Sequence, residues 1–179
     1  MFRDDVWRYL PLGPVPTIAI GGIGLILLVA LSLVRQPGAQ KAAGWLLALT
    51  GAGVVVVTLG RGIGPGRGNL VPGRTIHYEW VENVNHALGI ANVLGNVILF
   101  VPVGWLLALL ARRSLVTPLL VGCGLSVAIE LVQAVVFRSP DIDDVILNTV
   151  GTLLGALVAS ALRGACSAMR AQRVVPDAT

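Results

Sequence analysis

Long apolar runs alternate with short polar stretches along the chain, and this pattern predicts membrane-spanning helices. A helix needs about 20 mostly apolar residues to cross a bilayer. The runs that approach this length are Thr17–Val34, Gly44–Gly60, Ala91–Ala111, Leu115–Phe137 and Asp144–Leu162. The connections Arg35–Ala43 and Arg112–Ser114 are short enough to allow only tight turns between antiparallel helices. We therefore expect an all-α fold, an integral membrane helical bundle of about five transmembrane helices.

The composition supports a membrane protein and excludes some other classes. The chain has 179 residues, of which 55% are hydrophobic and 12% charged, whereas a soluble domain has about 25% charged residues. The net charge of +4 comes from basic residues that flank the apolar runs, so it gives no reason to expect nucleic acid as a partner. The expected partner is the lipid bilayer.

Charges beside the runs predict the orientation, because basic residues are enriched in short cytoplasmic loops. The two short connections are purely basic: they carry Arg35, Lys41, Arg112 and Arg113. We place them in the cytoplasm together with the C-terminus. The N-terminus and the long segment Arg61–Ile90 then lie outside.

Polar side chains lie near the outer ends of three neighbouring predicted spans. They are Asn92, Asn96, Glu130, Gln133, Asp144 and Asn148. At 1.5 Å per residue, Glu130 lies about 10 Å below the outer end of its span. Ionisable groups within a bilayer usually face the protein interior or a wet cavity, so we expect a shared, partly wet pocket that opens outward. The alternative is a structural ion pair of Glu130 with Arg138 or Arg74 that locks the bundle.

The outer segment Arg61–Ile90 contains no recognisable nucleotide or metal motif. Its glycine-rich start lacks the Gly-Lys-Ser/Thr ending of a phosphate-binding loop. The stretch His77–His86 predicts a short helix at the membrane surface, with Trp80 at headgroup level. Its histidines and glutamates do not have the spacing of a closed zinc site, so we expect them to be solvated.

Two further features concern the last predicted span. Asp143 and Asp144 could hold a divalent cation through oxygen ligands, or they could cap the start of the helix, where acidic groups are favourable. We expect no cofactor otherwise. Gly151 and Gly155 form a GxxxG pattern, which permits close helix packing and predicts a possible homo-oligomer through these glycines.

Three blocks of the sequence, taken in order and at their spacing, resemble a VanZ-like domain. They are Asn69–Ile76, Asn92–Gly104, and Glu130–Gln133 followed by Arg138 and Asp141–Gly151. The resemblance implies a bacterial multi-pass protein of the inner cell membrane, related to teicoplanin-resistance proteins. It divides the chain into two N-terminal helices over 1–60, a VanZ-like core over 61–162 and a basic cytoplasmic tail over 163–179.

The same resemblance implies a polar core that would bind a ligand. Its residues are Asn92, Asn96, Glu130, Gln133, Arg138, Asp141, Asp143, Asp144 and Asn148. The main hypothesis is a binding or modulating protein for a lipid-linked cell-envelope component, linked to glycopeptide resistance. The alternative is a membrane-embedded hydrolase or transferase with Glu130 as general acid or base. A proton-coupled transporter through Glu130 ranks lowest, because no inverted repeat is visible.

Overall fold

A computed structural model gives the fold and describes residues 26, 28–33, 37–59, 68–111, 114–135 and 140–172. These residues are helical except for turns, short connections and one isolated bridge between Asn69 and Asp141. The predicted all-α class is therefore confirmed.

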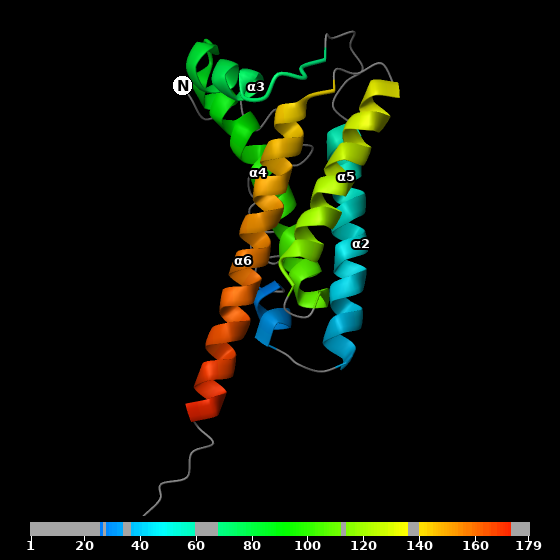
Figure 1. Cartoon of the computed structure of the whole chain (residues 1–179), viewed down its shortest axis with the longest axis vertical. Coiled ribbons are helices and arrows are strands. Elements are labelled where there is room, and N and C mark those ends of the chain that lie inside the picture. The colour runs from blue at the N-terminus through cyan, green and yellow to red at the C-terminus, as the bar shows by residue number, and fades with distance from the viewer. Residues whose placement is uncertain are drawn as a thin grey trace, which may run out of the picture.

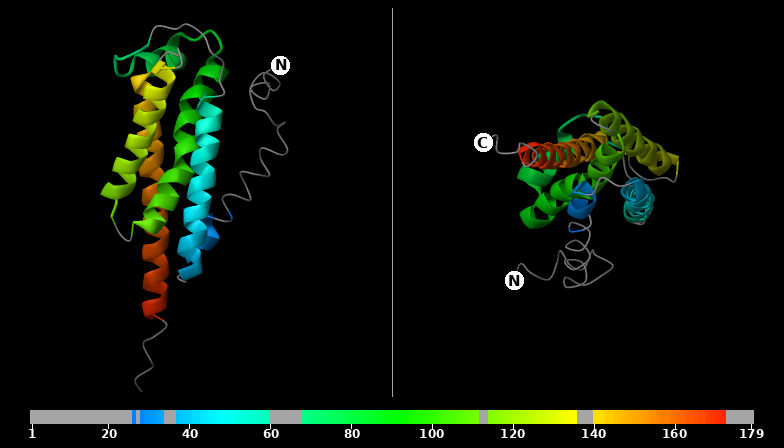
Figure 2. Two further views of the ribbon diagram at one scale, coloured as in Figure 1. Left: turned by 90° about the vertical axis from the view of Figure 1, so that its right-hand side faces the viewer. Right: turned by 90° about the horizontal axis from the view of Figure 1, so that it is seen from below.

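Four long helices run side by side along the long axis of the molecule (Figure 1). They are α2 (Pro37–Leu59), α4 (His86–Leu110), α5 (Val116–Val135) and α6 (Ile142–Gln172). Successive helices run in opposite directions, as Figures 1 and 2 show. Two short helical pieces, α3 (Arg74–His77) and the π-helix η2 (Tyr78–Glu82), lie across one end of the bundle. We call this end, which residues 68–85 and 140–141 cover, the loop end.

Within the described residues, three helices are long and apolar enough to cross a membrane: α4, α5 and the part of α6 over Ile142–Met169. Their outer faces expose large apolar side chains, including Ile98, Leu131 and Leu154, which suits contact with lipid. The predicted number of about five spans is not confirmed, since most of the first predicted span lies outside the described residues.

Helices α4 and α6 begin at polar side chains that satisfy free backbone N–H groups. Asn85 precedes α4, and its side-chain oxygen accepts the N–H of Leu88 at 3.3 Å. Asp141 precedes α6 and accepts the N–H of Asp143 at 2.9 Å. These contacts have the form of N-caps, which explains why both helices start at the loop end where they do.

The last helix is longer than the sequence pattern predicts. We expected residues 163–179 to form a tail, but α6 continues to Gln172. The reason is that Ala165, Ala168 and Ala171 favour helix regardless of the surrounding medium. Figure 2 shows this part of α6 running past the other helices at the end opposite the loop end.

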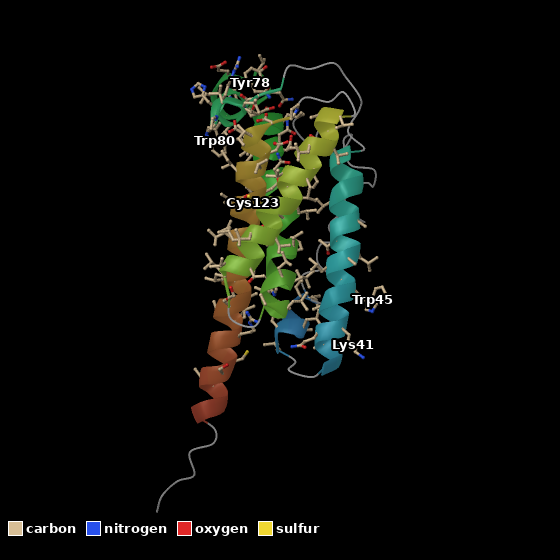
Figure 3. The ribbon with its side chains drawn as sticks, turned by 45° about the vertical axis from the view of Figure 1, so that its right-hand side comes forward. Lys41, Trp45, Tyr78, Trp80 and Cys123 are labelled. Atoms are coloured by element: carbon tan, nitrogen blue, oxygen red, sulfur yellow. The ribbon has the colours of Figure 1, made fainter. Side chains whose placement is uncertain are left out.

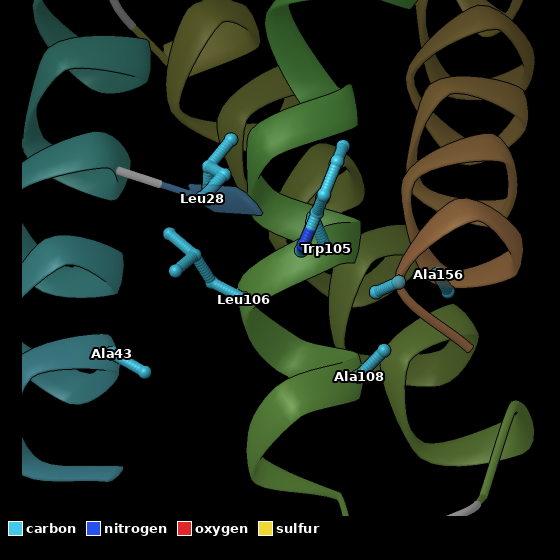
Figure 4. Packing of buried hydrophobic residues seen from close by; sticks show 7 residues of the cluster. Leu28, Ala43, Trp105, Leu106, Ala108 and Ala156 are labelled. Carbon is cyan, nitrogen blue, oxygen red and sulfur yellow. The ribbon is translucent and has the colours of Figure 1, made fainter. Parts of the chain in front are cut away.

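The apolar core consists of two clusters between α4 and its neighbours. The first cluster, shown in Figure 4, joins α4 to α2, α6 and the helical residues 28–33. Within it, the indole N–H of Trp105 donates to the Ser32 hydroxyl at 2.7 Å, and that hydroxyl donates to the carbonyl of Leu28 at 2.8 Å. The second cluster surrounds Phe100, which is fully buried. Helix α4 is thus the centre of the bundle.

Close backbone contact between α4 and α6 explains the GxxxG pattern. A Cβ atom added at Gly151 or Gly155 would overlap a carbonyl oxygen of α4. Gly104 of α4 is equally tight against the main chain of Thr152. Both glycines of the pattern are buried inside one chain, so the close packing that they permit is intramolecular. A homo-oligomer would need a different surface.

Candidate functional site

The loop end is built on two segments far apart in the sequence that pair through their main chains. The N–H of Asn69 donates to the carbonyl of Pro140 at 2.8 Å, and the N–H of Ile142 donates to the carbonyl of Asn69 at 2.9 Å. These bonds form the parallel bridge between Asn69 and Asp141. The pairing places the segment that leads into α3 directly beside the start of α6.

Asp143 fixes the entry into α3 and is fully buried. Its carboxylate accepts three backbone N–H groups: Gly73 at 2.6 Å, Thr75 at 2.7 Å and Ile76 at 3.2 Å. Gly73 adopts a left-handed conformation, with φ 82 and ψ −8, which matches the third position of a type II turn after a proline. Asp143 therefore acts as a helix cap. It caps α3, however, and not the start of α6, where capping was predicted from the sequence.

Asp141 reinforces the same contact through side chains. One carboxylate oxygen accepts the hydroxyl of Thr75 at 2.5 Å, and the other accepts the amide of Asn69 at 3.0 Å. Together with Asp143, these groups connect residues 69–76 to the start of α6. We call this set of contacts among Asn69, Thr75, Asp141 and Asp143 the clamp.

Glu130 connects α5 to the clamp from inside the bundle. It is buried, with 8% of its surface exposed, and its carboxylate accepts the N–H of Asp141 at 2.7 Å. Arg74, one of the two partners predicted for an ion pair with Glu130, is exposed and pairs with no described carboxylate. Glu130 thus holds the first residues of α6 against the end of α5.

The π-helix is held against the first turns of α4 through Glu79. Its carboxylate accepts the side-chain amides of Asn83 at 2.5 Å and Asn92 at 3.4 Å. The backbone approaches so closely here that a Cβ atom at Gly89 would overlap the carbonyl oxygen of Glu79. The predicted helix over His77–His86 is instead interrupted: it ends at Glu82, and α4 begins at His86.

Two polar contacts deeper in the bundle join α6 to its neighbours. Asn96 of α4 donates to Asp144 at 2.5 Å, and Asn148 donates to the hydroxyl of Ser126 on α5 at 2.8 Å. Ser126 is fully buried, and Asn148 is 3% exposed. The expected convergence of polar groups from α4, α5 and α6 is therefore present.

The predicted ligand residues have different places in the structure. Asp141, Asp143 and Glu130 hold the loop end together, and Asn92 contacts η2 through Glu79. Asn96 joins α4 to Asp144 of α6, and Asn148 joins α6 to Ser126 of α5. Gln133 is buried on the face of α5 that carries Glu130. Arg138 lies outside the described residues. A ligand role for any of them stays a prediction.

Sequence reasoning missed several members of this arrangement as polar partners. They are Thr75, Glu79 and Ser126, with Asn69 recognised only as part of a sequence block. Asn69 and Thr75 could have been found, because they belong to the same family pattern as Asp141 and Asp143. Ser126 gives no signal of its own, since a lone serine in an apolar run usually bonds to its own helix.

The cation site predicted at Asp143 and Asp144 has little support from the geometry. Both oxygens of Asp143 already accept backbone N–H groups. In the part of the chain that the structure describes, no group of three or more His, Cys, Asp or Glu side chains could hold a metal ion. His77 forms only an exposed pair with Glu82 at 3.3 Å.

Large apolar side chains are exposed in the segment 70–84 at the loop end, and Figure 3 labels Tyr78 and Trp80 among them. The exposed residues of this group are Leu70, Val71, Tyr78, Trp80, Val81 and Val84. We call them the apolar rim. Tryptophan and tyrosine favour the membrane–water interface, so the rim suits the headgroup level predicted for Trp80.

Comparison with known proteins gives one family. The model described as VanZ/LLP1 matches residues 23–163, which include the clamp and the helices from α2 to α6 as far as Arg163. Neither the curated proteins nor the solved structures compared with the chain give a match.

Proposed function

The chain belongs to the VanZ/LLP1 family, and we propose that it is a membrane-embedded binding protein for a lipid-linked cell-envelope component. The observation that carries this proposal is the apolar rim beside the carboxylates and amides of the loop end. A purely structural clamp has no need of exposed aromatic residues around it. A lipid ligand needs polar groups for its headgroup and an apolar surface for its chains.

The charges of the loop end favour a headgroup that donates hydrogen bonds. Between residues 68 and 92 and in 130–135 and 140–148, the described carboxylates outnumber the arginines. They are Glu79, Glu82, Glu130, Asp141, Asp143 and Asp144, against Arg74 alone. Carboxylates accept strong bonds from sugar hydroxyls or a peptide amine. Arg138, two residues before Pro140 in the sequence, would hold the phosphate of the same ligand.

This binding would act at the outer surface of the inner membrane, where the loop end lies in the predicted orientation. A protein that holds a lipid-linked envelope component there would limit the access of a glycopeptide to it. That is the route by which we expect a member of this family to confer teicoplanin resistance.

Native mass spectrometry of the detergent-purified protein tests the proposal. Wild type is compared with Asp144→Asn, which removes a charge but keeps an oxygen that can accept from Asn96, and with Arg138→Ala. The control is Lys41→Gln, since Lys41 is exposed on α2 at the opposite end of the bundle (Figure 3).

We expect an envelope lipid on wild type and on the Lys41 variant, and a loss of that lipid from the other two. All four proteins must elute as monodisperse species, so that misfolding does not explain the loss. Equal lipid retention by wild type and all three variants, or no lipid on wild type even after incubation with envelope lipid extract, would contradict the proposal.

A further inference from the structure

Asn148 has a hydrogen-bonding group that the described part of the chain does not satisfy. Its side-chain oxygen is buried and accepts no hydrogen bond from any described residue. The other amide atom donates to Ser126 at 2.8 Å. A buried polar atom without a partner is unfavourable, and most such atoms in proteins bond to protein or ordered water.

Rotating the amide does not remove this requirement. If the oxygen and nitrogen of Asn148 exchanged places, the oxygen would accept the Ser126 hydroxyl, and the NH2 group would occupy the unsatisfied position. The Ser126 hydroxyl can serve either orientation, since it both donates and accepts. In both orientations, one end of the amide, either the oxygen or the NH2 group, has no partner among the described residues.

Polar side chains of α5 and α6 lie between this position and the loop end. On α5, Ser126, Glu130 and Gln133 are all buried and lie at helical spacing on one face. On α6, Asp144 lies one turn above Asn148, about 6 Å along the axis. The unsatisfied atom therefore lies at the inner end of a line of polar groups that begins at the clamp, and not in an isolated part of the apolar core.

We propose that a small polar site between α5 and α6 binds a hydrogen-bond donor at the amide of Asn148. The donor is an O–H or N–H group, either of a water molecule or of the headgroup of the envelope lipid. The headgroup source rests on the proposed function, whereas the water source does not. Ser126 positions the amide, and Asp144 and Glu130 line the approach.

A crystal structure of the wild-type chain grown in a lipid mesophase, with ordered water visible, tests the site directly. We expect density within hydrogen-bond distance of the Asn148 amide, about 2.7–3.2 Å. An isolated spherical peak identifies water, and density continuous with an elongated molecule identifies a headgroup. A protein side chain at this position, or no density there, overturns the inference.

Native mass spectrometry of the double variant Asn148→Leu with Ser126→Ala gives a second readout. The variant replaces both polar groups by apolar ones, so neither partner is left unsatisfied. If the donor belongs to the lipid, the fraction of lipid-bound protein falls about tenfold, which is the effect of losing one buried polar contact. If the donor is water, lipid retention is unchanged and the spherical peak disappears from the crystal structure of the variant.

The two experiments separate this inference from the proposed function. Lipid on wild type, with nothing against Asn148, contradicts the site and leaves the binding function standing. A water peak at Asn148 in a protein that never retains lipid contradicts the function and leaves the site standing. If the double variant does not fold, the wild-type crystal structure alone decides.

Discussion

Replacement of Asp143 by asparagine should release the segment 69–76 from the bundle. The carboxylate accepts N–H groups of Gly73, Thr75 and Ile76 at 2.6, 2.7 and 3.2 Å. A carboxamide has the same size but only one oxygen. In its best orientation the oxygen keeps Thr75 and Ile76, and the NH2 group then faces the N–H of Gly73, with which it cannot bond.

The expected cost follows from these contacts. A hydrogen bond to a charged group contributes about 1.5–3 kcal/mol and a neutral one about 0.5–1.5 kcal/mol. One charge-assisted bond is lost and two become neutral, so docking of the segment weakens by about 3–5 kcal/mol. Since 1.4 kcal/mol corresponds to a factor of ten, the amides of Thr75 and Ile76 should exchange with solvent about 100 to 4,000 times faster.

Hydrogen–deuterium exchange of the full chain in lipid nanodiscs measures this effect peptide by peptide. The matched control is Glu82→Gln, which makes the same change of charge at the same end. Among the described residues Glu82 pairs only with His77, and both side chains are more than half exposed, so the loss of this pair should change exchange by at most about fivefold. If the two variants exchange equally at residues 73–76, Asp143 does not hold the loop end and the argument fails.

Two glycine substitutions test the close backbone contacts, with controls on the same helices. Gly89→Ala would place a methyl group on the carbonyl oxygen of Glu79. Overpacking of about 1–3 kcal/mol should then lower Tm by about 3–10 °C. The control is Gly95→Ala, where the added methyl group meets nothing within 4 Å, so Tm should stay unchanged or rise slightly. Gly155→Ala should lower Tm similarly by separating α6 from α4, whereas Gly164→Ala, which also meets nothing within 4 Å, should not. Thermal unfolding in detergent measures the Tm of both pairs. If the Tm of a control fell as much as that of its partner, helix propensity and not the close backbone contact would set the effect.

The sequence predicts the helices well because apolar runs report directly on burial in lipid. The three membrane-spanning helices α4, α5 and α6 fall on the expected runs, and Gly151 and Gly155 give the close packing that their spacing permits. Helix α6 continues ten residues beyond Leu162, where the predicted apolar span ends. A hydropathy pattern marks where the membrane ends, but an alanine-rich helix can continue into water.

The partners of the polar residues could not be predicted in the same way. Asp143 lies in the first turn of α6, and local capping chemistry is the natural expectation there. Its actual partners are backbone N–H groups 67 to 70 residues earlier. A backbone N–H has no sequence signature, so only the fold reveals such a contact. The Pro72-Gly73 pair was the only sequence signal of this contact, since it marks a turn whose free backbone N–H groups need acceptors.

The clamp changes how mutations in this protein must be interpreted. Asp143 and Asp144 are neighbours with the same charge, but Asp143 holds the loop end, whereas Asp144 accepts from Asn96 within the bundle. A loss of resistance or lipid retention in Asp143→Asn would report an undocked loop. The same loss in Asp144→Asn, with exchange at residues 73–76 unchanged, would report a role of the Asp144 charge other than docking of the loop, because asparagine keeps an acceptor for Asn96. Measuring both properties in both variants therefore separates a residue that builds the site from one that uses it.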